Sequence, residues 1–319
     1  MSRIHEALKK AEQERATTQG GGTLPGFAAT PVAEHPFAHQ PVMDNTPAES
    51  FLGATASGHP SPGMPAFASP FSLDALLAGS ASSQWTPDPA TMLFLNGDDS
   101  ARGAEEFRTL RSRLYHAREK MTLKKILVTS ALPKEGKSFT CANLAQVLVR
   151  QHGRRVLLVD ADLRGPRLHM MLGTTSSPGL SEYLQGENDE FSIMQRGPFE
   201  NLFFIPSGRE IGNAAELVGN GRLKALLQRV EPLFDWIIID SPPVIPVSDS
   251  SVLAKACDGV VMVVRSNSTP FDMAKKARQE FPVEALVGVV LNGTSGEALP
   301  YSRYYYAPYE KKKGTTNKG

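Results

Sequence analysis

The stretch "SALPKEGKSFT" at residues 130–140 combines residue types that bind phosphate groups. It follows the apolar run "KILVTS" and precedes a helical pattern, so "GKS" lies where a strand would lead into a helix. In such a loop the backbone N–H groups and the helix N-terminus attract phosphate, the lysine reaches the terminal phosphates, and the serine hydroxyl binds Mg²⁺. The predicted Mg-nucleotide loop contains Pro133, Lys134, Glu135, Gly136, Lys137, Ser138 and Phe139.

This motif is incomplete, because Ala131 stands where the first glycine of G-x-x-x-x-G-K-S belongs. A strand–turn–helix with a chance "GKS" is the alternative. Three carboxylates at the ends of later apolar runs favour the nucleotide site: Asp160 and Asp162 follow "VLLV", and Asp240 ends "DWIIID". In an extended chain, residues two apart point to the same side. A phosphate loop and three acidic side chains at one edge of a sheet are what a Mg-nucleotide site needs.

Six apolar runs must supply the strands that position these groups: residues 125–130, 155–162, 201–206, 235–240, 259–265 and 286–292. They are apolar at nearly every position, and helical patterns such as "KSFTCANLAQVLVRQHG" separate most of them. Such runs are typical of strands buried on both faces of a parallel sheet. We therefore predict a doubly wound α/β domain of the P-loop NTPase kind, with helices on both faces and the ligand at the carboxyl ends of the strands.

Four parts follow from composition. Residues 1–19 are predicted to carry a short charged helix, and residues 20–98 a linker rich in Pro, Gly, Ala and Ser. No Lys or Arg occurs between Arg15 and Arg102. Such a segment buries too little apolar surface to offset its ordering entropy, so the linker is predicted to be disordered. Within it, "FSLDALLAG" at 71–79 has the pattern of one or two helical turns. The predicted domain occupies residues 99–298, and a tyrosine-rich tail occupies 299–319.

The tail holds five of the seven tyrosines within nine positions, in "YSRYYYAPY". Aromatic clusters can form a core, stack on nucleic acid or accept chemical groups. The net charge of +1 and the few basic residues among the rings speak against nucleic acid. Two cysteines, and no apolar run of about 18 residues, favour a cytoplasmic protein without a membrane span.

These residues together resemble the bacterial tyrosine kinases (BY-kinases) of capsule and exopolysaccharide assembly. "VLLVDADLRGPRLH" is similar to their Walker A′ element, and "DWIIIDSPP" to their Walker B element. "EEFRTLRSRL" matches their E-x-x-R-x-x-R oligomerisation motif through Glu105, Arg108 and Arg111. The tyrosine-rich tail fits as well. The N-terminal helix and linker resemble those of soluble autokinases found with exopolysaccharide and exosortase gene clusters.

The resemblance implies an ATP- and Mg²⁺-dependent protein tyrosine autokinase that phosphorylates its own tail, largely between subunits of a ring. The implied catalytic residues are Lys137, Asp160, Asp162 and Asp240. Magnesium would be held by Ser138, Asp160 and Asp240, and Asn292 would contact the adenine. The implied phosphoacceptors are Tyr301, Tyr304, Tyr305, Tyr306 and Tyr309.

The implied partners are a membrane polysaccharide copolymerase, or chain-length determinant protein, as activator and a cognate tyrosine phosphatase. The activator would recruit the kinase to the inner face of the plasma membrane. Arg303 and the lysines at 311–313 suggest a further hypothesis, because added phosphate would change how the tail contacts a neighbouring subunit and so break the ring.

Two other functions use the same kind of loop. Partitioning and septum-site ATPases carry a signature lysine five residues before the "GKS" lysine, and here that position is Leu132. A nucleotide-binding scaffold of the polysaccharide machinery would use nearly the same residues as a kinase, so the sequence leaves it open.

Overall fold

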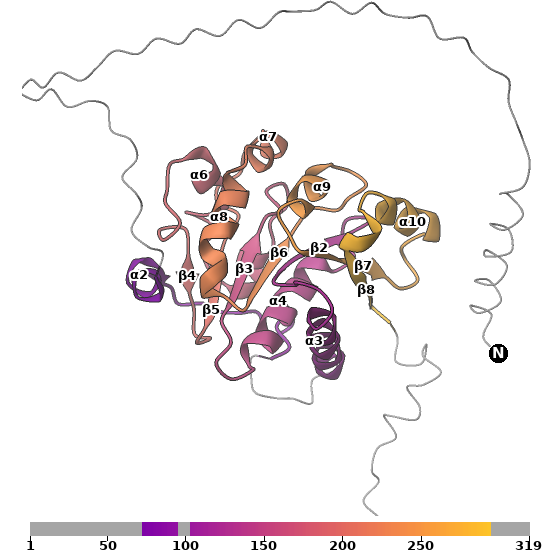
Figure 1. The fold of residues 1–319 in the computed structure, drawn as a ribbon, viewed down its shortest axis with the longest axis horizontal. Helices are drawn as coiled ribbons and strands as arrows, with labels where there is room; N and C mark the ends of the chain where they lie inside the picture. Colours follow the sequence, from indigo (N-terminus) through magenta and orange to yellow (C-terminus); the bar gives the residue numbers. More distant parts are fainter. Residues whose placement is uncertain (1–71, 95–102, 295–319) are drawn as a thin grey trace, which may run out of the picture. The chain divides into compact units, whose positions relative to one another are not determined.

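Residues 72–94 and 103–294 are described by a computed structural model of the chain (Figure 1). The predicted N-terminal helix, residues 20–71 of the predicted linker and all five tail tyrosines lie outside these residues. No helix in the described ranges is long and apolar enough to cross a bilayer.

One sheet organises the described residues, with strand order β1-β4-β5-β3-β6-β2-β7-β8. Its neighbouring strands are parallel, except that β4 and β5 are antiparallel. The strands are β1 (Ala81–Ser82), β2 (Lys125–Ser130), β3 (Val156–Asp160), β4 (Gln195–Arg196), β5 (Leu202–Ile205), β6 (Trp236–Asp240), β7 (Gly259–Arg265) and β8 (Leu286–Asn292). The six strands predicted from apolar runs are all confirmed. The short strands β1 and β4 gave no such signal.

Helices cover both faces of this sheet (Figure 1). One face carries α3 (Ala104–Arg118), α4 (Lys137–Val149) and α5 (Leu168–Leu172). The other carries α6 (Leu180–Gln185), α7 (Ala214–Gly219), α8 (Arg222–Val230), α9 (Asp249–Ala254) and α10 (Phe271–Gln279). Helix α2 (Leu73–Gly79) and the 3₁₀ turns Glu231–Leu233 and Val283–Ala285 complete the helical elements of the described residues.

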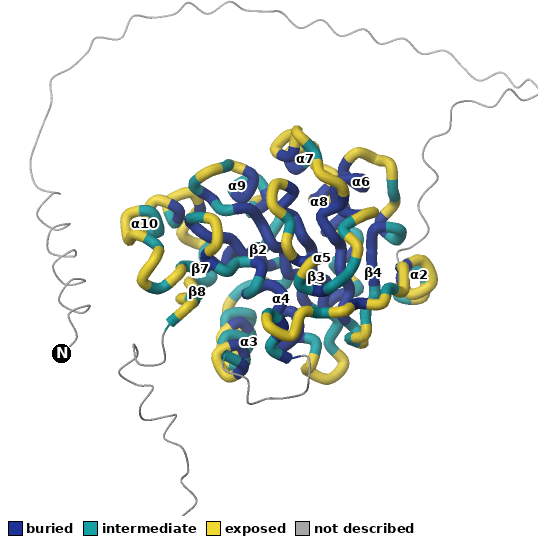
Figure 2. Tube along the Cα trace, turned by 180° about the vertical axis from the view of Figure 1, so that it is seen from behind, coloured by how far each residue is buried: buried dark blue, intermediate teal, exposed yellow. Residues whose placement is uncertain are grey.

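The central strands of the sheet are buried on both sides, which explains why they are apolar at nearly every position (Figure 2). Along β3, Leu157 and Val159 belong to the core on one face, while Val156 and Leu158 belong to the core on the other. The doubly wound α/β prediction is therefore confirmed. A sheet with only one covered face would instead alternate apolar and polar residues.

The disorder predicted for the linker is wrong for residues 72–94. The island at 71–79 does contain a helix, α2, whose Leu76 is fully buried, and the chain after it runs along the domain. Trp85, Met92 and Phe94 are buried in the same core as α3 and α4. Composition misled here because a few large apolar residues suffice to bind an extended segment rich in Pro and Ser to an existing surface.

Candidate active site

The loop from Ala131 to Gly136 joins β2 to α4 and is held by its own side chains. Lys134 and Gly136 adopt positive φ angles of 66° and 97°. The buried carboxylate of Glu135 turns inward, where it accepts the Leu132 N–H at 2.9 Å and the Thr269 hydroxyl. Ala131 is fully buried without a positive φ, so its backbone does not require the glycine that the motif expects.

Gly136 is required because another strand lies against it. A Cβ at this position would lie 2.0 Å from Nδ2 of Asn292, at the end of β8. That Nδ2 donates a hydrogen bond of 2.9 Å to the Glu135 carbonyl. Asn292 therefore holds the loop in place; its contact with adenine remains a prediction.

The carboxyl ends of three neighbouring strands bring the predicted acids to the loop. Asp160 of β3 and Asp240 of β6 are directly opposite each other in the register, and Asp240 is opposite Val128 of β2. Asp160 and Asp240 are both fully buried, and Asp162 is nearly so. The predicted convergence of loop and acids at one edge of the sheet is confirmed.

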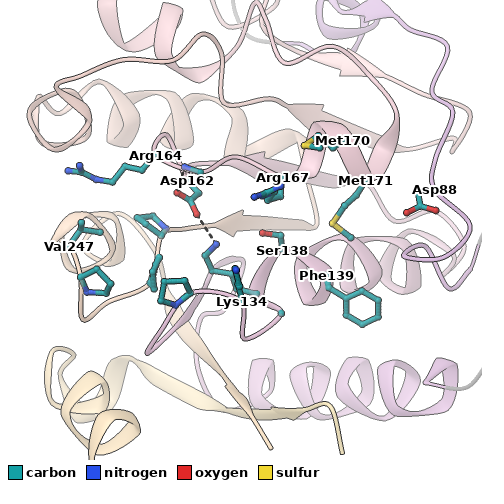
Figure 3. A pocket seen from close by; sticks show the side chains of 17 residues that line it. Asp88, Lys134, Ser138, Phe139, Asp162, Arg164, Arg167, Met170, Met171 and Val247 are labelled. Carbon is teal, nitrogen blue, oxygen red and sulfur yellow. Dashed lines mark hydrogen bonds and ion pairs between the residues drawn. The ribbon is translucent and has the colours of Figure 1, made fainter. Parts of the chain in front are cut away.

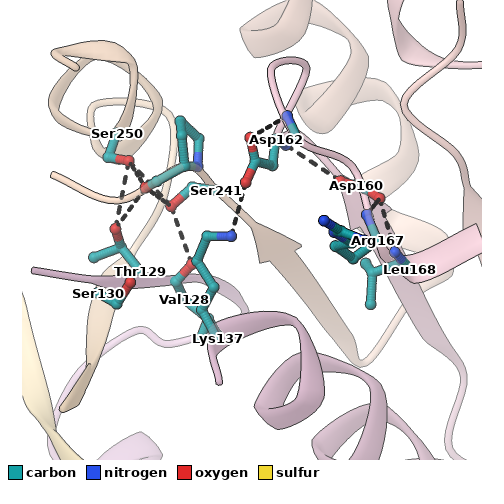
Figure 4. A network of polar contacts seen from close by, with 12 residues as sticks. Val128, Thr129, Ser130, Lys137, Asp160, Asp162, Arg167, Leu168, Ser241 and Ser250 are labelled. Carbon is teal, nitrogen blue, oxygen red and sulfur yellow. Dashed lines mark hydrogen bonds and ion pairs between the residues drawn. The ribbon is translucent and has the colours of Figure 1, made fainter. Parts of the chain in front are cut away.

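Asp160 and Asp162 have separate partners, contrary to the prediction that they point together (Figure 4). Strand β3 ends at Asp160, so its alternation does not continue to Asp162. Asp160 accepts backbone N–H groups: Oδ1 from Asp162 at 3.3 Å, and Oδ2 from Leu168 at 3.1 Å and Arg167 at 3.3 Å. Burial and then the charge of Asp240 raise the pKa of Asp160 well above its usual value.

Lys137 points from the first turn of α4 to the acids. Its Nζ lies 2.7 Å from Oδ2 of Asp162 (Figure 4). Burial alone would lower the pKa of Lys137, but the charges of Asp240 and Asp162 outweigh burial and raise it. Lys137 is therefore a buried cation at neutral pH, beside the groove that the loop forms.

Asp240 lies beside this lysine, and neither of its buried carboxylate oxygens accepts a hydrogen bond among the described residues. Burial raises its pKa to about 6, although Lys137 and the nearby Ser138 hydroxyl act in the opposite direction. Buried oxygens without donors, next to a hydroxyl, fit a hard cation such as Mg²⁺. The described residues contain no cluster of three or more His, Cys, Asp or Glu side chains that would hold a metal alone.

A second polar network fixes the loop that follows β6 (Figure 4). The Ser241 hydroxyl donates to the Val128 carbonyl at 3.0 Å, and the Thr129 hydroxyl donates to the Pro242 carbonyl at 3.0 Å. The Ser250 hydroxyl of α9 also donates to the Pro242 carbonyl. These bonds give the prolines after Asp240 a fixed position.

A pocket of about 740 Å³ opens over these groups (Figure 3). Its volume suits a nucleotide-sized ligand. The predicted residues Pro133, Lys134, Gly136, Lys137, Ser138, Phe139 and Asp162 line it. Four other predicted site residues are not among its lining residues: Glu135, Asp160, Asp240 and Asn292.

Comparison with known proteins agrees with this site. Residues 124–273 match a family model described as an AAA domain. The chain is 34% identical over 205 residues to the tyrosine-protein kinase YwqD of Bacillus subtilis, which covers 64% of this chain and 85% of that protein. The chain belongs to the bacterial tyrosine-protein kinase family.

Two further relatives extend this assignment. The tyrosine-protein kinase wzc of Salmonella typhimurium is 30% identical over 222 residues, which cover 69% of this chain but only 31% of that longer protein. The solved kinase domain of Escherichia coli tyrosine kinase ETK is similar with a TM-score of 0.58 at 30% identity, covering 64% of this chain and 80% of that one.

The predicted oligomerisation motif of this kinase lies on α3. Arg108 forms an ion pair with Glu105 at 2.7 Å, and Arg111 donates to the Val147 carbonyl of α4 at 3.0 Å. Both arginines therefore have partners within the chain, and their role between subunits remains a prediction.

The kinase pocket also contains residues that were not among the predicted site residues: Asp88, Arg164, Gly165, Arg167, Met170, Met171, Pro242, Pro243, Pro246 and Val247. Arg164 completes a D-x-D-x-R sequence that begins at Asp160. It binds both carboxylate oxygens of the buried Asp249, at 2.7 and 3.2 Å, and this ion pair gives it a structural role. Arg167, in contrast, is exposed in the pocket and its guanidinium has no ion pair within the described residues. Its position within the Walker A′ stretch "VLLVDADLRGPRLH" is the one signal that could have found it.

Proposed function

We propose that this protein is an ATP-dependent tyrosine autokinase that phosphorylates its C-terminal tyrosines, in trans within an oligomer. One observation carries the proposal: Lys137, Ser138 and Asp162 line one nucleotide-sized pocket, and Asp240, whose oxygens accept no hydrogen bond from the described residues, lies buried beside Lys137. The chain also belongs to a tyrosine kinase family. The five tail tyrosines are the proposed acceptors.

The chain's own residues suit phosphoryl transfer. Backbone N–H groups of the loop and the first turn of α4 bind the phosphates, and Lys137 neutralises charge on the γ-phosphate. Asp162 lies beside that lysine, where it accepts the phenol proton as the tyrosine oxygen bonds to the γ-phosphorus and the bond to the β-phosphate oxygen breaks. Ser138 and Asp240 would hold Mg²⁺, which would supply positive charge along the phosphates. Asp160 accepts three backbone N–H groups and so holds the Walker A′ loop, and its part in binding Mg²⁺ remains a prediction.

The cellular role follows from the family resemblance. We place the kinase in the regulation of exopolysaccharide or capsule polymerisation and export, at the inner face of the plasma membrane. A membrane polysaccharide copolymerase would activate it, and a tyrosine phosphatase would reverse its action.

Mass spectrometry of the tail after incubation with Mg-ATP is the direct test of the proposed function. We expect phosphate on residues among Tyr301, Tyr304, Tyr305, Tyr306 and Tyr309, and none when all five are phenylalanine. The Lys137→Met chain has an intact tail but no working site, whereas the five-phenylalanine chain has a working site but no acceptor. If transfer is in trans, mixing the two chains should restore phosphotyrosine. Binding of ATP without any phosphotyrosine would favour the nucleotide-binding scaffold instead.

The two pocket arginines provide a further prediction, because they differ in their partners. Arg167→Ala should leave the melting temperature nearly unchanged and lower tail phosphorylation about tenfold to a hundredfold, since a cation near the transferred phosphoryl group is lost. Arg164→Ala should lower the melting temperature, because it leaves the buried Asp249 without its bidentate partner. Thermal melts and initial rates of the two variants, measured in parallel, check both. Equal loss of stability in the two variants would contradict the assignment of Arg167 to the phosphate site.

A further inference from the structure

Residues 80–94, which we call the strap, cross the domain next to the proposed nucleotide pocket. The strap begins with β1, which pairs with β4, and the Ser83 N–H donates to the Arg196 carbonyl at 2.9 Å. Trp85 then inserts its ring into the core, with only 6% of its surface exposed. The ring meets Phe204 and Phe199 with centroid distances of 6.1 and 6.4 Å. A tryptophan buried in this way fixes the strap at one point.

After Trp85 the strap is bonded to the end of α5. The Thr86 N–H donates to the Gly173 carbonyl at 3.1 Å, and the Asp88 N–H donates to the Met171 carbonyl at 3.0 Å. Gly173 has φ 62°, and a Cβ there would lie 2.0 Å from the Thr86 carbonyl oxygen. The contact is close enough that this position requires glycine.

The far end of the strap is bonded to α4, the helix that begins with Lys137. The Leu93 N–H donates to Oδ1 of Asn143 at 2.8 Å, and Nδ2 of Asn143 donates to the Thr91 carbonyl at 2.9 Å. Asn143 is fully buried, so these bonds are shielded from water. The strap thus connects α5 to α4, which are the two helices that flank the pocket.

Both helices carry active-site groups at their N-terminal ends. The Leu168 N–H at the start of α5, with the N–H of Arg167 before it, binds Asp160, and α4 starts with Lys137 and Ser138. Asp88 of the strap and Met171 of α5 also line the pocket itself (Figure 3). A shift of the strap would therefore move the pocket wall and the backbone donors of Asp160 together.

We infer that the strap is part of the catalytic unit, with Trp85 as a positioning residue that sets the spacing of α5 and α4 around the nucleotide. This inference rests on the proposed nucleotide site. The strap precedes the region that carries the kinase motifs. The strap thus provides an element, on the N-terminal side of the kinase motifs, that positions the nucleotide site of the same chain.

The test compares Trp85→Ala with Trp85→Phe in the full chain. Phenylalanine keeps a ring against Phe199 and Phe204, and it loses no hydrogen bond, because the indole N–H has no partner among the described residues. Measured by titration with Mg-ATP below the melting temperature, Trp85→Ala should lose about tenfold in affinity. Trp85→Phe should stay within about twofold of the wild type, because it conserves most of the packing.

A second readout needs no catalysis. Because linkage is reciprocal, Mg-ADP should slow hydrogen exchange at the Thr86 and Asp88 amides of the wild type. In nucleotide-free Trp85→Ala, exchange at the Leu168 amide should be faster than in the wild type, since its bond to Asp160 is less well held.

A core variant separates positioning from general stability. Phe234 is buried just before β6, at the amino ends of the strands and so away from the pocket. Phe234→Leu should therefore lower the melting temperature without changing Mg-ATP affinity. The inference is overturned if Trp85→Ala behaves like Phe234→Leu, if Trp85→Phe binds as weakly as Trp85→Ala, or if Mg-ADP leaves exchange in the strap unchanged. Each readout concerns nucleotide binding, so absence of tyrosine transfer would refute the proposed kinase activity and leave this test intact.

Discussion

Lys137→Met is expected to abolish tail phosphorylation, with a loss of at least about a thousandfold in rate. Lys137 is the buried cation of the pocket, 2.7 Å from Asp162 and close enough to Asp240 for that charge to raise its pKa. Methionine keeps the length and apolar stem of the side chain but removes the charge that neutralises the γ-phosphate. Quantitative detection of phosphotyrosine after incubation with Mg-ATP measures the effect.

A matched control is available at an exposed lysine. Lys120 lies just after α3 and is exposed to solvent, so Lys120→Met should keep the wild-type rate. If Lys137→Met retained more than about a tenth of the wild-type rate, the assignment of this lysine to the γ-phosphate would be wrong.

Asp240→Asn is expected to inactivate the enzyme and to stabilise it at the same time. The pKa of Asp240 is raised from 3.8 to about 6, so the folded protein holds this proton more tightly than the unfolded chain does. The ionised carboxylate therefore costs about 3 kcal/mol of stability above pH 6, and this cost vanishes as the pH falls toward 4. Asparagine carries no charge and so removes this destabilisation. Part of the gain is lost because the buried amide group of asparagine also lacks hydrogen-bond partners.

Thermal melts of the nucleotide-free protein check the sign. Asp240→Asn should melt several degrees above the wild type at pH 8, and the difference should disappear near pH 4. At pH 8 its affinity for Mg-ATP should fall at least about a hundredfold, because an amide oxygen is a weaker ligand for Mg²⁺ than a carboxylate. A variant that binds Mg-ATP normally would exclude Asp240 from the metal site.

Asp258 offers a control variant whose melting temperature should change in the opposite direction. Its Oδ2 accepts the Lys124 and Lys125 N–H groups, and its Oδ1 lies 3.0 Å from the Lys125 ammonium. Both oxygens of its carboxylate thus have partners. Asp258 lies at the amino end of β7, whereas Asp240 lies at the carboxyl end of β6. Asp258→Asn should lower the melting temperature at pH 8 and leave Mg-ATP binding unchanged.

The sequence alone determined the main strands and the place of the phosphate loop. An apolar run buried on both faces is a local pattern, and so is a loop between strand and helix that ends in Gly-Lys-Ser. Because parallel strands present their carboxyl ends at one edge, Asp160, Asp162 and Asp240 could be assigned to one site before any distance was known.

Only the tertiary structure decided which hydrogen-bond partners each of these carboxylates has, and so which of them has unpaired oxygens for a metal ion. Asp160 accepts three backbone N–H groups, while neither oxygen of Asp240, opposite it in the sheet, accepts a hydrogen bond from the described residues. The strap was missed for the same reason: its Pro, Ser and Thr residues resemble those of the linker before it, and its order comes from a surface built by α4, α5 and β4. Burial and the supply of partners depend on residues far apart in the chain, and no local pattern records which of them will meet.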